Sequence, residues 1–85
     1  MEEDHLRSIL EEEFSPTHAD LERVTRQAMK LDQSGNFKED TGDELTVDLI
    51  RNKLEEADRP IKAGWNWWVG QLNVFFESSY ERFQI

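Results

Sequence analysis

Aromatic residues in this chain are concentrated near its C-terminal end. Seven of the nine Phe, Trp and Tyr residues lie in the last 27 positions, and the three tryptophans share one run, Gly-Trp-Asn-Trp-Trp-Val-Gly, at residues 64–70. Each such side chain removes about 150 to 250 Å² from water when it is buried. A chain of 85 residues has room for one small core. We therefore expect a single domain, residues 1–85, whose core is organised by the C-terminal segment.

Charge is distributed in the opposite way. Residues 1–58 carry 17 Asp and Glu against 7 Lys and Arg, and residues 59–85 carry 2 against 3, which gives the formal charge of −9. Long-range repulsion opposes the approach of such a chain to phosphate backbones and anionic lipids. We therefore expect no direct nucleic-acid binding and no membrane partner. No stretch reaches the ~18 apolar residues needed to cross a bilayer, and the acidic start lacks the pattern of a signal peptide, so we expect a cytoplasmic protein.

Apolar spacing predicts two helices in the first half of the chain. Residues 2–14 place Leu6, Ile9, Leu10 and Phe14 three or four positions apart, and the pair Ser15 and Pro16 should end this helix. A second helix should begin either with Ser15 as its cap and Pro16 as its first residue or after a Thr17 cap with Asp20 three residues on. It should end near Gln33, with Gly35 as its stop. Its inward stripe is Leu21, Val24, Ala28 and Leu31.

A loop and a third helix are expected next. Residues 34–44 lack an apolar period and collect turn-forming residues, so they are the predicted main loop. Thr46 alone, or Thr41 with Glu44, should cap a third helix that ends before Pro60. Its apolar stripe is Val47, Ile50, Leu54 and Ala57. Asp58 is the predicted cap of the following helix, with Pro60 in the first turn.

The aromatic segment determines the architecture. At about 100° per residue, one broad apolar face runs from Ile61 to Phe83, and a thinner stripe of Ala63, Trp67, Gly70 and Val74 lies opposite. The predicted core residues on the broad face are Trp65, Trp68, Leu72, Phe75, Phe76 and Phe83. A β-hairpin through residues 69–71 is the competing interpretation, because Trp, Val and Phe favour strands. We expect a helix, since the spacing continues to Phe83, and hence an all-α fold: a small bundle of three to four helices organised around a C-terminal aromatic-rich helix.

Residues that could support catalysis or hold a cofactor do not form a familiar motif. The chain has no cysteine, which excludes disulfides and thiolate metal sites. Residues 32–43 resemble a calcium loop in their oxygen-bearing residues, but Phe37 stands where that loop requires glycine. His5 and His18 lie in separate predicted helices without ligand spacing. We therefore expect no cofactor, no metal, no catalytic residue and no enzymatic activity.

The thinner stripe of the C-terminal helix is the candidate interaction surface. Trp67, Gly70 and Val74 combine an aromatic anchor with a position where a partner helix could approach closely, although Trp67 could instead belong to an internal second layer. Acids in the predicted loop, Glu39, Asp40, Asp43 and Glu44, could orient a basic partner or only keep the chain soluble. The sequence thus favours a non-enzymatic protein–protein interaction module, an adaptor, small subunit or regulator. Its partner is another protein or a second copy of the chain.

Two other functions fit the same sequence. An acidic inhibitor, similar in design to an antitoxin, would place its carboxylates on the basic nucleic-acid-binding surface of a partner. Its binding would weaken steeply with salt and would depend on the loop acids. A small metal or acid–base enzyme would require a cleft in which His5 or His18 lies beside a buried carboxylate.

Overall fold

The computed structural model describes residues 1–77 and 79–85, and every regular element in them is helical. The order is α1 (Glu3–Phe14), α2 (His18–Ser34), α3 (Asn36–Thr41), α4 (Val47–Ala57) and α5 (Ile61–Phe76), followed by one 3₁₀ turn, η1 (Glu81–Phe83). The predicted all-α class is confirmed, and the aromatic run lies in a helix rather than a hairpin.

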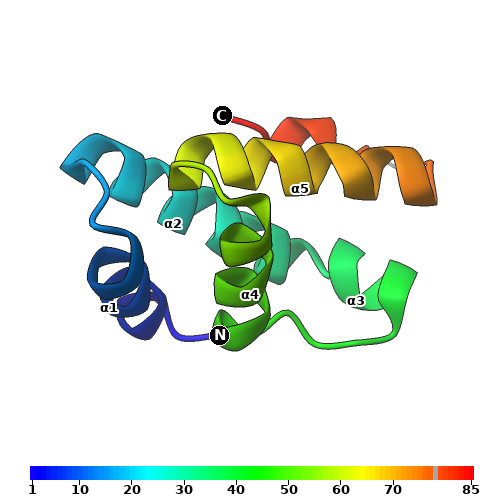
Figure 1. Cartoon of the computed structure of the whole chain (residues 1–85). Helices are drawn as coiled ribbons and strands as arrows, with labels where there is room; N and C mark the ends of the chain where they lie inside the picture. Colours follow the sequence, from blue (N-terminus) through cyan, green and yellow to red (C-terminus); the bar gives the residue numbers. More distant parts are fainter. Residues whose placement is uncertain (78) are drawn as a thin grey trace.

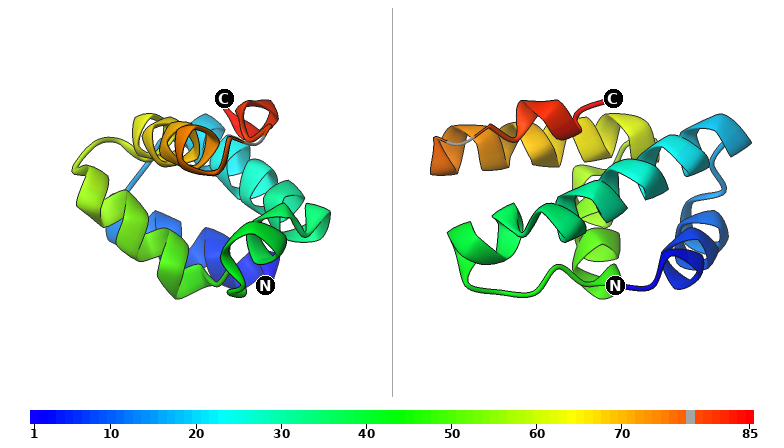
Figure 2. Two further views of the ribbon diagram at one scale, coloured as in Figure 1. Left: turned by 90° about the vertical axis from the view of Figure 1, so that its right-hand side faces the viewer. Right: turned by 180° about the vertical axis from the view of Figure 1, so that it is seen from behind.

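The helices form two layers. α2 and α5 lie in one layer, and α1 and α4 lie in the other, as Figures 1 and 2 show. Between the layers, α4 packs on α5 and α1 packs on α2. Within the layers, α2 contacts α5 and α1 contacts α4. Residues 79–85, which we call the return segment, run back along α5 and contact α2.

Two threonine caps predicted from the sequence are present. The Thr17 hydroxyl accepts a hydrogen bond from the Asp20 N–H at 3.2 Å, and the Thr46 hydroxyl accepts one from the Leu49 N–H at 3.1 Å. Such caps satisfy backbone donors that a helix start leaves without partners. Gly35 ends α2 with φ of 75°, a left-handed conformation that suits glycine.

The prediction that Asp58 caps the last long helix is wrong. Asp58 instead terminates α4 in a left-handed conformation with φ of 51°. α5 begins directly after Pro60. Proline pushes the residue before it, Arg59, out of the helical region, so the helix has to start on the far side of Pro60.

The predicted loop at residues 34–44 contains a short helix, α3. Its apolar anchor is Phe37, which is 6% exposed and lies with its ring centroid 5.9 Å from that of Trp68. One buried aromatic side chain therefore orders a stretch that has no apolar period of its own.

The prediction that the aromatic helix continues to Phe83 is also wrong. α5 ends at Phe76, and Glu77 takes a left-handed conformation with φ of 52°. The return segment then buries Tyr80 and Phe83 against the core from a reversed chain direction. Side chains of α5 form hydrogen bonds with the backbone of the return segment. Trp65 Nε1 donates to the Phe83 carbonyl at 2.8 Å, and Asn73 Oδ1 accepts from the Tyr80 N–H at 3.1 Å.

The core is built around Trp65, which has no exposed surface and meets Trp68 edge to face at 5.5 Å. Burial of the predicted core residues Trp65, Trp68, Leu72 and Phe83 is confirmed. Phe76 is only partly buried. Phe75 was predicted to be core and is 79% exposed, because it lies at the edge of the apolar arc and α4 crosses only the first half of α5 (Figure 1).

Gly64 sets the distance between α4 and α5. A Cβ atom at this position would lie 3.2 Å from Ala57 Cβ and 3.3 Å from Leu54 Cδ2. The absence of a side chain lets the two helices approach closely, which holds the end of α4 under the start of α5.

Candidate functional site

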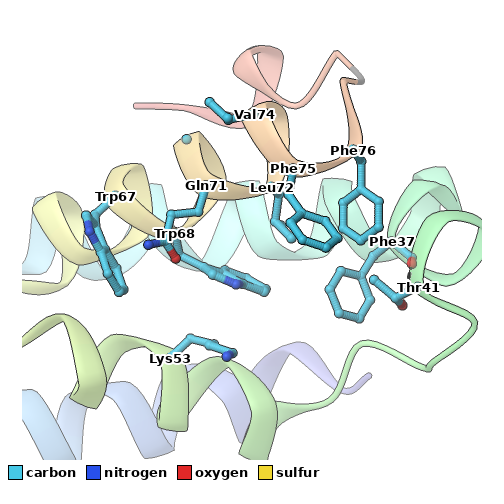
Figure 3. Close-up of a pocket in the computed structure, with 11 residues that line it drawn as sticks. Phe37, Thr41, Lys53, Trp67, Trp68, Gln71, Leu72, Val74, Phe75 and Phe76 are labelled. Atoms are coloured by element: carbon cyan, nitrogen blue, oxygen red, sulfur yellow. Dashed lines mark hydrogen bonds between the residues drawn. The ribbon is translucent and has the colours of Figure 1, made fainter.

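A groove opens along α5 where α4 and α3 leave it uncovered. It has a volume of about 790 Å³, and Figure 3 shows the side chains around it. α3 contributes Phe37 and Thr41, and α4 contributes Lys53. The remaining lining residues come from α5: Trp67, Trp68, Gly70, Gln71, Leu72, Val74, Phe75 and Phe76.

The groove has a fixed floor and an exposed apolar rim. Trp68 and Leu72 are 3% and 8% exposed and belong to the core. Val74 and Phe75 are 77% and 79% exposed, and the Phe75 ring packs edge to face on Phe76 with centroids 4.9 Å apart. A small domain gains nothing in folding from apolar side chains left in water, so these two residues are candidates for binding.

The predicted interface residues Trp67, Gly70 and Val74 all border this groove, but Val74 lies at its outer margin, and Figure 3 shows its side chain on the opposite side of α5 from Phe37. Trp67 is partly buried and packs against the core while lining the opening. Gly70 lies toward the return segment, since a Cβ atom there would be 3.6 Å from Gln84 Nε2. The side from which a partner helix was expected to approach Gly70 is therefore partly covered by the chain itself.

The four acids proposed for steering have different surroundings. Asp40 accepts a hydrogen bond from the Tyr80 hydroxyl at 2.6 Å, which ties α3 to the return segment. Lys38 lies 2.6 Å from Glu44 and lowers the pKa of that carboxyl. Glu39 and Asp43 are exposed and make no ion pair within the described part of the chain. Of the four acids, Glu44 is therefore the one paired with a cation, and Asp40 is the one held by a neutral donor.

Tyr80 is fully buried beside this acidic segment. Its hydroxyl also donates weakly to the Asn36 carbonyl at 3.3 Å. Burial, followed by the contact with Asp40, raises the pKa of the Tyr80 phenol well above its ordinary value. The phenol therefore stays neutral and acts as a hydrogen-bond donor that fixes α3 at one end of the groove.

The histidines are apart from the groove. His5 and His18 are both exposed, on α1 and at the first residue of α2. Among the described residues, no three His, Cys, Asp or Glu side chains are arranged to hold a metal ion. The described helices are also too short or too polar to cross a bilayer. The absence of enzymatic activity stays a prediction.

Beyond Trp67, Gly70 and Val74, sequence reasoning did not predict the lining residues of the groove, and three of them are informative: Phe37, Lys53 and Phe75. Phe37 had one usable signal, a single aromatic residue inside a polar stretch. Phe75 had none, because its exposure depends on where α4 crosses α5. Helical spacing is enough to pair Lys53 with Glu56, which lies 3.3 Å away, but it does not show that Lys53 lines the groove.

These features define a small all-α domain in which one aromatic helix supplies both the core and an open groove. Residues 1–73 match the family model of the WNWW domain, so the chain belongs to that family. The letters of this name are the one-letter sequence of residues 65–68, Trp-Asn-Trp-Trp. Searches of curated proteins and of solved structures each found no match.

The four residues 65–68 divide their roles in this structure. Trp65 and Asn66 hold the return segment, Asn66 through a pair of hydrogen bonds with the backbone of Ile85 at 2.7 and 3.0 Å. Trp67 and Trp68 line the groove. The matched region ends at residue 73, before the exposed pair Val74 and Phe75.

Proposed function

We propose that this protein is a non-enzymatic interaction module that binds another protein through the groove beside α5. The observation that carries the proposal is the exposure of Val74 and Phe75, 77% and 79%, at the rim of an aromatic groove. Contiguous apolar surface of this kind, rimmed by polar side chains, is typical of docking sites.

The composition of the groove supports this function. Tryptophan and phenylalanine are enriched where interfaces concentrate their binding energy, and one such anchor contributes about 2 kcal/mol or more. Thr41, Lys53 and Gln71 add polar groups at the margin, where they can fix the orientation of a partner.

The rigidity of the groove supports it too. The floor residues Trp68 and Leu72 are part of the core, and Phe37 is held against Trp68. A site formed before binding loses little conformational entropy when it is occupied, so more of the contact energy appears as affinity.

The acidic-inhibitor alternative has less support. Of its four carboxylates, Asp40 and Glu44 are engaged by Tyr80 and Lys38 within the chain. The exposed pair, Glu39 and Asp43, fits better as a steering charge at the margin of an apolar site, where it raises the association rate more than the affinity.

Site-specific photo-crosslinking in the native cell tests the proposal. A photoreactive phenylalanine analogue placed at Phe75 should give a discrete protein adduct, whereas the same analogue at Glu12, exposed on α1, should not. The adduct should be lost when Val74→Ser is added, because the rim then loses part of its apolar surface. Adducts that are equal at both positions, or that Val74→Ser leaves unchanged in a folded protein, would show that the groove is not the docking site.

A further inference from the structure

We infer that the occupant of the groove is an amphipathic helix of a partner protein whose apolar stripe is flanked by Lys or Arg, rather than a second copy of this chain. The inference rests on the proposed function and specifies its partner. It depends on the shape of the apolar surface and on the charges around it.

The apolar surface has the dimensions of a helix-binding site. Trp67, Gln71 and Phe75 follow one another four residues apart on α5, so the groove extends about 12 Å along the helix axis. Two turns of a partner helix, with apolar anchors at positions i, i+4 and i+7, cover this length. Phe37 and Thr41 close one end from α3, and Lys53 borders the side formed by α4 (Figure 3).

The cations near the groove are already neutralised. Lys53 lies 3.3 Å from Glu56, and Lys38 lies 2.6 Å from Glu44. An acidic partner would therefore have to compete with Glu56 and Glu44 for these two amines.

The acids near the groove are not neutralised in the same way. In the chain, Glu39 and Asp43 flank Thr41, which lines the groove. Both are exposed, and neither forms an ion pair with another described residue. The uncompensated charge around the apolar floor is therefore negative, and a helix with basic flanks complements it.

The same charges disfavour a second copy of the chain. Each copy carries a formal charge of −9, and two copies meeting through this groove would bring like charges together. In a two-fold interface the same patch of each copy faces the other. Lys53, the cation that lines this patch, already pairs with Glu56 and would contribute little to neutralising the acids of the second copy. A basic partner relieves the repulsion that self-association would increase.

A displayed library of helical peptides tests the inference. The peptides share an apolar stripe at i, i+4 and i+7, and their flanking positions vary among Lys, Glu, Gln and Ser. Selection on the wild-type protein should enrich Lys over Glu at the flanks by at least about fivefold. The selected peptides should bind Phe75→Ala at least about tenfold more weakly, as expected when an interface anchor is truncated.

A matched pair of charge variants identifies the acids responsible. Glu39→Gln/Asp43→Asn should remove the preference for Lys while peptide binding stays sensitive to Phe75→Ala. The control Glu11→Gln/Glu12→Gln changes the net charge equally on α1, none of whose residues lines the groove, and should keep the preference.

Each result has a distinct meaning. Peptides that depend on Phe75 but show no preference for Lys would overturn the inference and leave the proposed function standing. Selection that yields no peptide dependent on Phe75 would overturn both. Sedimentation showing a wild-type dimer that Phe75→Ala dissociates would make the second copy the occupant, and the basic helix would be wrong.

Discussion

Two glycines of α5 differ in what surrounds them, and they allow a matched test at the scale of single residues. Alanine in place of glycine within a helix is favourable by about 0.5 to 1 kcal/mol, because the unfolded chain loses freedom. At Gly70 the nearest neighbour of a new Cβ is Gln84 Nε2 at an ordinary 3.6 Å, whereas at Gly64 it is Ala57 Cβ at 3.2 Å. The helix propensity term is the same at both positions, and only the packing term differs.

We predict that Gly70→Ala raises the free energy of unfolding by about 0.5 to 1 kcal/mol. The free energy of unfolding of Gly64→Ala should be lower than that of Gly70→Ala by about 1 kcal/mol or more, because α4 has to move away from α5. Urea unfolding of the two variants beside the wild type measures the difference. Equal stabilisation at both positions would show that the approach of α4 to α5 is not limited by Gly64.

Tyr80 provides a second test at this scale. Its hydroxyl bonds Asp40 at 2.6 Å and the Asn36 carbonyl at 3.3 Å, so Tyr80→Phe should cost about 1 to 2 kcal/mol at neutral pH. Because the pKa of the phenol is raised in the folded state, its contribution to stability is complete below pH 10.0, the ordinary pKa, and is lost as the pH rises further.

The chain has one tyrosine, so tyrosinate absorbance at alkaline pH reports this group alone. We expect ionisation to coincide with unfolding in the wild type. The stability of Tyr80→Phe should change less between neutral and alkaline pH. Ionisation of Tyr80 near its ordinary pKa in a protein that remains folded would contradict the burial of the phenol.

At the scale of elements, the return segment stabilises α5 more than its length suggests. It buries Tyr80 and Phe83 and gives the Trp65 indole its acceptor. Removing one buried aromatic side chain costs about 3 to 5 kcal/mol, and a core of this size supplies about as much in total.

We predict that deleting residues 77–85 leaves the chain largely unfolded. Far-ultraviolet circular dichroism should show loss of helix, and tryptophan emission should shift to the red as Trp65 enters water. Gln84→Ala is the matched control, because this side chain is exposed and makes only a 3.4 Å contact with the Asn66 carbonyl. A deletion variant that unfolds as cooperatively as Gln84→Ala would mean that residues 1–76 form the folding unit.

Predictability from the sequence differed between elements for physical reasons. α1, α2 and α4 follow apolar repeats and sequence-local caps such as Thr17 and Thr46, which act within three residues. α5 ends at a non-glycine residue, Glu77, in a left-handed conformation, and the chain beyond it is held by the distant contacts of Tyr80 and Phe83, which apolar spacing does not reveal. The groove depends on both local sequence and distant packing. Helical spacing identified Trp67 and Val74, whereas the exposure of Phe75 follows from the packing of α4.

For the whole molecule, the separation of charge from aromatic surface is the dominant feature. Residues 1–58 carry 17 acidic against 7 basic side chains and so account for the negative charge of the chain, while the groove lies mainly on α5. Self-repulsion destabilises a compact chain, and salt screens it with a Debye length of about 10 Å at 0.1 M.

We predict that stability rises with ionic strength. The urea midpoint should increase between about 0.02 and 0.3 M NaCl, because screening of the excess acids outweighs the weakening of exposed pairs such as Lys38 with Glu44. Glu11→Gln/Glu12→Gln/Glu13→Gln should raise the midpoint at low salt and reduce its dependence on salt. A midpoint that falls with added salt would mean that ion pairs, and not repulsion, dominate the electrostatics of the fold.

The bond between Trp65 and Phe83 also bears on how the protein is made. The two residues are separated by 18 positions, so the core cannot close until the chain through Phe83 is free to fold. Because synthesis proceeds from the N-terminus, α1 to α4 are made before the segment that covers Trp65. Stable folding should therefore follow the synthesis of the return segment and should not accompany that of α1 to α4.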